Sequence, residues 1–175
     1  PTKSRLFKSI TRDKDIRGSI VSIVDDVVQN VSLITCNAGS IRSNHYHKKD
    51  FHYMYVLEGE FDYFYKELNN DVVHYFKVKK DDIIFTPKNE IHATFFPLRT
   101  KLIVSSMLPR DQETYENDTV RVEFINNDNL QFMINKYVLK KYDNISKTTY
   151  KSYQQCNLLK LSMCNKSKNM SIFQT

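Results

Sequence analysis

The first 125 residues consist mainly of short runs of β-branched, aromatic and aliphatic residues, separated by residues that form turns. Turn residues stand at 37–39, 58–59, 69–70, 80–82 and 87–89, and no helical periodicity interrupts the series. Many short strands at nearly regular spacing are typical of an antiparallel sandwich or barrel. We therefore expect an all-β domain over residues 1–125, with strands at 19–24, 31–36, 45–46, 53–57, 61–66, 72–78, 83–86, 93–96, 102–107 and 120–124.

The pattern changes after residue 125. Residues 127–141 carry apolar side chains at helical spacing, and the Asn-Asn-Asp run at 127–129 suits the start of a helix. Beyond Tyr142 the chain is weakly patterned and rich in Ser, Lys, Asn and Thr. We expect residues 126–175 to form a C-terminal helix followed by a polar peripheral segment. One interpretation of that segment is a truncated linker to a further domain.

Hydrophobic residues make up 41% and aromatic residues 13% of the 175 residues, which is the composition of a globular protein. No apolar run approaches the roughly 20 residues of a membrane helix, and the N-terminus lacks the apolar core of a signal peptide. We expect a cytoplasmic protein without a membrane partner. The three cysteines, an odd number without a Cys-x-x-Cys pair, argue against a disulfide framework.

The net charge of +6 raises the question of nucleic-acid binding. Lysines are scattered among acidic residues over the first 130 positions, and they gather only in the C-terminal tail. Such a distribution is typical of a solvated basic surface, so we expect no nucleic-acid partner.

Four of the five histidines fall into one pattern, in which His45, His47 and His52 lie close together and His92 follows about forty residues later. On a strand, His45 and His47 project from the same face. His52 shares a face with Met54 and Val56, and His92 shares one with Thr94 and Phe96. If the strands form a barrel, the four imidazoles converge in its lumen and predict a site for zinc, nickel, iron or copper.

Neutral imidazoles leave the charge of a divalent ion uncompensated, so such a site is expected to attract an anionic ligand or to polarise a carbonyl group. Asp50 lies between two of the predicted ligands, either orienting an imidazole or, as we favour, lying on the surface of a loop. We interpret His74, outside the pattern, as a structural residue.

The histidines stand within a spacing that resembles a known family. The order Gly39-x5-His45-x-His47-x4-His52-x6-Gly59 resembles the first cupin motif, with His52 in place of its usual Glu. The resemblance extends over roughly residues 15–110 and implies a double-stranded β-helix, or jelly-roll barrel, in which the four histidines are the metal ligands.

The second cupin motif is matched by Asp81-x5-Pro87-x-Asn89-x2-His92. Asp81 and Asn89 replace glycines of that motif, and Phe96 replaces its final Asn.

A further resemblance is to cupins that act on nucleotide-linked sugars. Residues 15–20 include an Asp-x-Arg-Gly sequence, and Arg42 precedes His45 by three residues, with Ser43 where that group has a glycine. Residues 109–116 also look like a stretch of small cupins from surface-polysaccharide gene clusters. These features are similar to the 3,4-ketoisomerases and 3,5-epimerases of deoxythymidine-diphosphate-linked 4-keto-6-deoxy sugars.

That resemblance implies isomerisation or epimerisation next to a carbonyl group, in the biosynthesis of a surface glycan. His45 and His47 would move the proton, and Arg42 would bind the nucleotide sugar. Either Arg42 or a metal would stabilise the enolate. Tyr55 and Tyr63 are candidates for stacking on a base or sugar ring. A homodimer is also implied by the resemblance.

Two observations keep other functions open. Isomerases of this group work without metal, whereas His52 and His92 fit a metal cupin, and a metal held by all four imidazoles would leave none free as a base. The alternatives are a metal-dependent oxygenase or hydrolase of a small molecule, and a non-catalytic module that binds a sugar or a metal.

Overall fold

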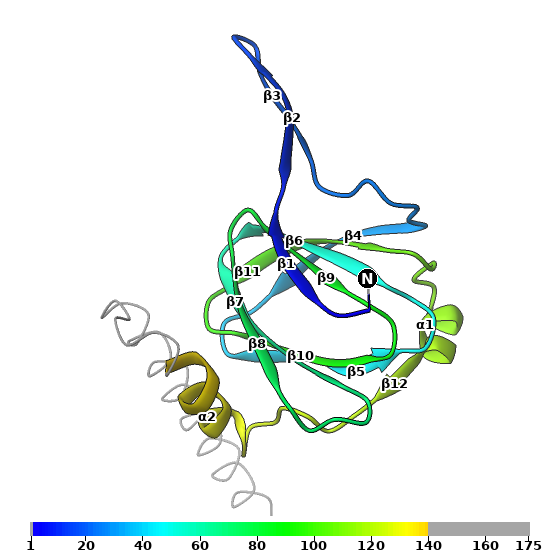
Figure 1. The fold of residues 1–175 in the computed structure, drawn as a ribbon, viewed down its shortest axis with the longest axis vertical. Helices are drawn as coiled ribbons and strands as arrows, with labels where there is room; N and C mark the ends of the chain where they lie inside the picture. The colour runs from blue at the N-terminus through cyan, green and yellow to red at the C-terminus, as the bar shows by residue number, and fades with distance from the viewer. Residues whose placement is uncertain (1, 140–175) are drawn as a thin grey trace, which may run out of the picture.

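The computed structural model describes residues 2–139 and arranges most of them in two five-stranded antiparallel sheets (Figure 1). The first sheet has the strand order β1 (Arg5–Lys8), β9 (Asp82–Thr86), β6 (His52–Glu58), β11 (Thr100–Ser106) and β4 (Asn30–Cys36). The second has the order β12 (Thr119–Arg121), β5 (Ser40–His47), β10 (Glu90–Phe96), β7 (Glu60–Glu67) and β8 (His74–Lys79). From β4 to β12 the chain alternates between the sheets except at the β7–β8 hairpin, which confirms the predicted jelly roll.

The space between the sheets is filled by alternate residues of the strands. On β6, Met54 and Val56 are buried while their neighbours Tyr53 and Tyr55 face outward, as the two-residue period of a strand requires. This intersheet core consists of Cys36, Met54, Val56, Phe61, Tyr63, Tyr65, Val78, Ile84, Phe96, Leu102 and Val104.

A second core lies on the outer face of the second sheet. The helix α2 (Leu130–Met133) and the π-helical segment η1 (Ile134–Leu139) pack there against residues of β7 and β10, including Phe64, Ala93 and Phe95. Strand β10 is therefore buried on both faces. Of the helix predicted at 127–141, the structure has helical residues from Leu130 to Leu139, so the helix begins three residues later than predicted and only its first four residues are α-helical; the rest of the predicted C-terminal segment lies outside the described residues.

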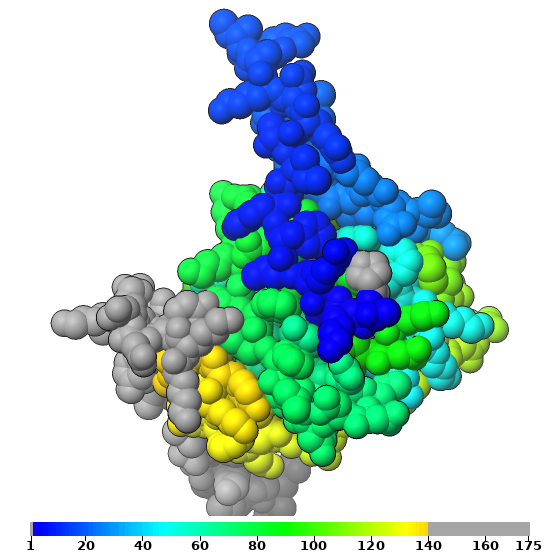
Figure 2. Space-filling model, viewed as in Figure 1, coloured from blue at the N-terminus to red at the C-terminus, as the bar shows by residue number. Residues whose placement is uncertain are grey.

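Sequence patterns did not reveal two N-terminal strands and one helix. Strand β1 has only two apolar residues and is held by pairing with β9. Strand β2 (Ile10–Asp15) pairs with β3 (Gly18–Ser22) in a hairpin that projects from the barrel, so its six residues are all exposed and show no burial alternation (Figures 1 and 2). The helix α1 (Gln112–Asp118) begins at Asp111, whose side chain accepts a hydrogen bond from the Thr114 N–H.

Several turns require a left-handed backbone. Ser43, Asp81 and Asn89, which stand where related motifs have glycine, have φ angles of 67°, 67° and 58°. Left-handed backbone, which glycine adopts most easily, is formed at these positions by residues with short polar side chains, at an energetic cost that such side chains reduce. Gly59 cannot be replaced in the same way, because a Cβ there would lie 2.6 Å from the carbonyl oxygen of Arg99.

None of the helices described between residues 2 and 139 has the length and apolar character needed to cross a membrane. The homodimer and the cytoplasmic location stay predictions.

Candidate functional site

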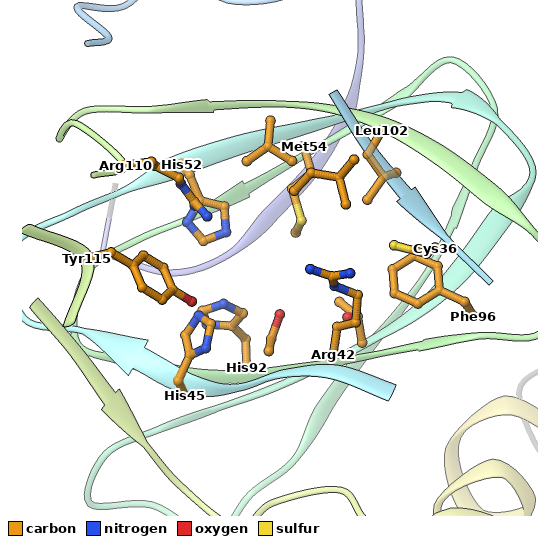
Figure 3. Close-up of a pocket in the computed structure, with 14 residues that line it drawn as sticks. Cys36, Arg42, His45, His52, Met54, His92, Phe96, Leu102, Arg110 and Tyr115 are labelled. Carbon is orange, nitrogen blue, oxygen red and sulfur yellow. The ribbon is translucent and has the colours of Figure 1, made fainter. Parts of the chain in front are cut away.

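A cavity of about 80 Å³ lies between the two sheets, with room for several water molecules or for part of a small ligand (Figure 3). Its walls carry imidazole, guanidinium, hydroxyl and apolar groups, and no Asp or Glu is among the described residues that line it. The lining residues with polar side chains or sulfur are Cys36, Arg42, Ser43, His45, His52, Met54, His92, Thr94, Arg110 and Tyr115.

A bulge in β5 brings Arg42 and His45 to this cavity together. Residues three apart on a regular strand point to opposite faces. Here His45 pairs with His92 while Ser43 pairs with Ala93, so Asn44 is an extra residue that restores both side chains to the cavity face.

The side chain of Asn44 holds the bulge in place. Its Nδ2 donates to the carbonyl oxygen of Ile125 at 2.7 Å, and its Oδ1 accepts from the Ile125 N–H at 2.9 Å. The segment after β12 thereby braces the bulge.

The four predicted histidines are all buried and lie in one cluster. The ring centroid of His45 is 4.7 Å from those of both His47 and His92, and the ring of His52 is 5.3 Å from that of His92. Ligand atoms of His45, His47 and His92 lie within 4.8 Å of one another, whereas His52 forms a group of that size with His47 and Asp50. The structure thus gathers three imidazoles from the second sheet and places His52, from the first sheet, beside them.

Hydrogen bonds fix the tautomers of two of these rings. The Nδ1 of His47 is 3.0 Å from Asp118 Oδ2, and the Nδ1 of His92 is 3.2 Å from the Glu90 carbonyl oxygen. Since an ionised carboxylate and a carbonyl only accept, Nδ1 carries the proton in each ring and a neutral ring has its lone pair on Nε2. These two Nε2 atoms and Nδ1 of His52 are buried without a hydrogen-bond partner among the residues described, so the donor set fits a divalent transition metal.

The environment keeps the rings neutral. Burial, followed by the charges of His47 and Arg110, lowers the pKa of His45 to about 3. Burial also lowers the pKa values of His47, His52 and His92, and Asp118 partly offsets the effect at His47. Neutral rings have the lone pairs that binding a metal or accepting a proton requires.

Asp118, at the end of α1, was not identified from the sequence. Besides accepting from His47, its carboxylate accepts from the N–H groups of Lys49 at 2.7 Å and Asp50 at 3.3 Å. It therefore orients the imidazole and fixes the loop between the histidines. Because it lies 71 residues from His47, no local pattern indicates the contact.

Our preferred interpretation of Asp50 as a loop-surface residue is wrong. Asp50 is buried, and its Oδ1 accepts from the Leu108 N–H at 2.9 Å. Burial raises the pKa of its carboxyl group. Asp50 lies close to His47 and His52, with ligand atoms within 4.8 Å of one another, and the alternative that it orients an imidazole stays a prediction.

Arg110 and Tyr115 also line the cavity, although sequence analysis predicts no role for either residue. Figure 3 shows Arg110 beside His52 and the Tyr115 hydroxyl pointing toward His45 and His92, whereas Arg42 lies farther along the cavity near Cys36 and Phe96. The sequence of residues 109–116 shows a resemblance to small cupins but no helical pattern, so it does not predict the helix that directs Tyr115 inward.

The two tyrosines predicted to bind substrate do not line this cavity. Tyr55 lies on the outer face of β6, where its hydroxyl donates to Asp81 at 2.9 Å. Tyr63 is fully buried, and its hydroxyl contacts Ser4 Oγ at 2.8 Å and Thr86 Oγ1 at 2.9 Å. His74 is exposed and stacks on Tyr65, and its structural role stays a prediction.

The winding of the strands and the cavity with clustered histidines define the chain as having the cupin fold. No protein-family model matches the sequence, and no curated protein matches it. Solved structures do match.

The QdtA 3,4-ketoisomerase from Thermoanaerobacterium thermosaccharolyticum, solved in complex with TDP, is 22% identical with a TM-score of 0.56, over 80% of this chain and 96% of that chain. WlaRB, a TDP-quinovose 3,4-ketoisomerase from Campylobacter jejuni, is 19% identical with a TM-score of 0.56, over 71% and 94%. The capsular polysaccharide assembling protein CapF from Staphylococcus aureus is 20% identical with a TM-score of 0.51, over 67% of this chain and 32% of that chain. At these identities the likeness is one of fold.

Proposed function

We propose that this chain binds a nucleoside-diphosphate-linked keto sugar at the cavity between its sheets, with only part of the ligand inside it, and moves a proton next to the sugar carbonyl, in the biosynthesis of a surface glycan. The observation that carries the proposal is a cavity lined by neutral imidazoles and two guanidinium groups, with no carboxylate among its described lining residues. Such a cavity favours an anionic ligand and offers groups for proton transfer. Fold neighbours that are 3,4-ketoisomerases, one of them solved with TDP, support the choice of ligand class.

His45 is our candidate for the base. It lies on the cavity wall and is the most accessible of the four imidazoles, at 9% exposed. As base it removes the proton from the hydroxyl-bearing carbon beside the carbonyl, which gives an enediolate. A proton then returns to the former carbonyl carbon, and the hydroxyl proton passes from the neighbouring oxygen to the former carbonyl oxygen, which completes the isomerisation. The ring of His47 lies 4.7 Å from that of His45 and is hydrogen-bonded to Asp118, so we propose that His47 helps to position the His45 ring.

Arg42 is our candidate for binding the nucleotide end of the substrate. Its guanidinium lies away from the histidine cluster in the same cavity, where it suits a diphosphate (Figure 3).

The test is incubation of the protein with TDP-4-keto-6-deoxyglucose, followed by NMR of the sugar. We expect a shifted carbonyl, and a loss of turnover of about 10²–10⁴-fold in His45→Asn. His74→Asn, which changes a histidine outside the cavity, is the matched control and is expected to retain turnover. A wild-type protein that neither converts nor is thermally stabilised by a panel of such sugars would refute the proposal.

A second candidate function is metal-assisted chemistry, which the buried nitrogens without partners favour. His45, His47 and His92 would hold the zinc, nickel, iron or copper ion, with His52 beside them. Such an ion acts as a Lewis acid toward a carbonyl group. His45 would then be a ligand and would not serve as the base.

Elemental analysis of gently purified protein separates the two candidates. Near-stoichiometric metal that is lost in both His47→Ala and His52→Ala supports the metal site. A metal-free protein that stays metal-free after reconstitution excludes it and leaves His45 as the base.

A further inference from the structure

Arg110 is held in one position by two neighbours. Its Nε donates a hydrogen bond to Ser106 Oγ at 2.8 Å, and Ser106 is fully buried at the end of β11. The guanidinium lies over the ring of Tyr115, with the Cζ atom 5.5 Å from the ring centroid. A guanidinium supported by a buried hydroxyl and an aromatic face loses little further freedom when it binds a ligand.

The charge of Arg110 has no direct partner among residues 2–139. Arg12, Arg17 and Arg121 each form an ion pair with a carboxylate, but Arg110 forms none within the described part of the chain. The neighbouring carboxylates are already engaged, since Asp50 accepts from Leu108 and Asp118 accepts from His47 and Lys49. The two Nη groups of Arg110 make no hydrogen bond to the described residues, although the side chain lines the cavity.

We propose that Arg110 is an anion-binding residue of the cavity, whose guanidinium binds an anionic oxygen of the ligand next to the imidazoles. The oxygen is either the enolate oxygen that develops at the reacting carbonyl or a phosphate oxygen. This role of Arg110 rests on the proposed function. It gives Arg110 the stabilisation of the enolate, which sequence analysis assigned to Arg42 or a metal. Arg42, farther along the cavity, is left to bind the diphosphate.

The same charge limits what the imidazoles can hold. A guanidinium lining the cavity repels a divalent cation placed there, and the carboxylates beside the cluster, Asp50 and Asp118, offset this repulsion only in part because they lie outside the cavity lining. An anion bound by Arg110 removes that repulsion. A metal in the cluster is therefore expected to bind together with an anion.

The experiment measures binding of two probes to the purified chain by calorimetry. Oxalate, a small planar dianion, imitates an enolate, and TDP carries the phosphates without the sugar. Arg110→Gln is expected to weaken oxalate binding at least about tenfold, since a charge-assisted hydrogen bond is lost, while leaving TDP binding within about twofold. Arg42→Gln is expected to show the reverse.

Two further variants separate binding from folding. Arg110→Lys keeps the charge but cannot reproduce the planar donor group, so an intermediate loss of oxalate affinity is expected. Arg99→Gln, an exposed arginine outside the cavity lining, is the matched control and should bind both probes as the wild type does. Thermal unfolding of each variant shows whether it is folded.

The outcomes are distinct. Loss of TDP binding alone in Arg110→Gln identifies the phosphates as the anion that Arg110 binds. Unchanged affinity for both probes in this variant, or no saturable binding of either by the wild type, overturns the inference. If oxalate binds through Arg110 but the protein converts no keto sugar, the role of Arg110 is supported and the proposed isomerase activity is refuted. If Arg110→Gln retains full turnover, the isomerase activity is supported and the role of Arg110 is refuted.

Discussion

Replacing Asn44 tests whether the β5 bulge depends on one side chain. Asn44→Ala removes both hydrogen bonds to Ile125, each contributing about 1 kcal/mol. It also puts alanine at a φ of 56°, which costs about 1–2 kcal/mol. We expect the free energy of unfolding to fall by about 3 kcal/mol in urea denaturation. Asn44→Gly loses the hydrogen bonds but tolerates the dihedral angle, so its loss should be about 1 kcal/mol smaller.

The comparison of these variants decides between the two causes. Equal losses in Asn44→Ala and Asn44→Gly would refute the dihedral argument. Losses below about 0.5 kcal/mol in both would refute the role of the hydrogen bonds. Asn117→Ala, which changes an exposed residue of α1, is the control and should leave stability unchanged. Since the bulge aims Arg42 and His45 into one cavity, both Asn44 variants should also bind TDP more weakly than the control.

Three further variants test other parts of the molecule. Gly59→Ala is expected to lose at least about 2 kcal/mol of stability, from the 2.6 Å approach to the Arg99 carbonyl oxygen and the positive φ; a neutral effect on urea denaturation would contradict the turn geometry. Leu130→Ala should cost about 2–5 kcal/mol because Leu130 is buried against the second sheet, whereas Phe132→Ala on the exposed side of α2 should cost less than about 0.5 kcal/mol; similar losses in both would argue against the packing of α2. Asp118→Asn is expected to lower zinc affinity by about 10–100-fold in a chelator competition, because His47 loses its carboxylate partner. Glu113→Gln changes an exposed residue and is the control. Equal zinc affinity in the two variants would show that Asp118 does not orient a ligand.

The all-β class and the inward faces of the histidines were predictable because both follow from the two-residue period of strands. That period placed His52 with Met54 and His92 with Thr94, as the structure has them. The resemblance to cupin motifs added the winding of the strands, which periodicity alone does not give.

The rest of the site depends on features that no local pattern shows. Alternation alone puts Arg42 and His45 on opposite faces, and only the bulge at Asn44 reunites them. Asp118 and Arg110 come to the cluster through α1 and the loop before it, far along the chain from His47. Burial of Asp50 depends on a contact with Leu108, 58 residues away, so its position in a loop between two ligands was misleading.

The left-handed turns affect how proteins related to this chain can be detected. All three glycines of the chain have a positive φ, and between residues 2 and 139 four other residues meet the same requirement: Ser43, Asn44, Asp81 and Asn89. Turns with a positive φ are usually occupied by glycine, because glycine adopts this conformation without strain. Where other residues adopt a positive φ, the backbone dihedral angles can be kept although the glycines of the sequence motif have been replaced. Relatives of this chain are therefore better sought by superposing backbones than by comparing sequences.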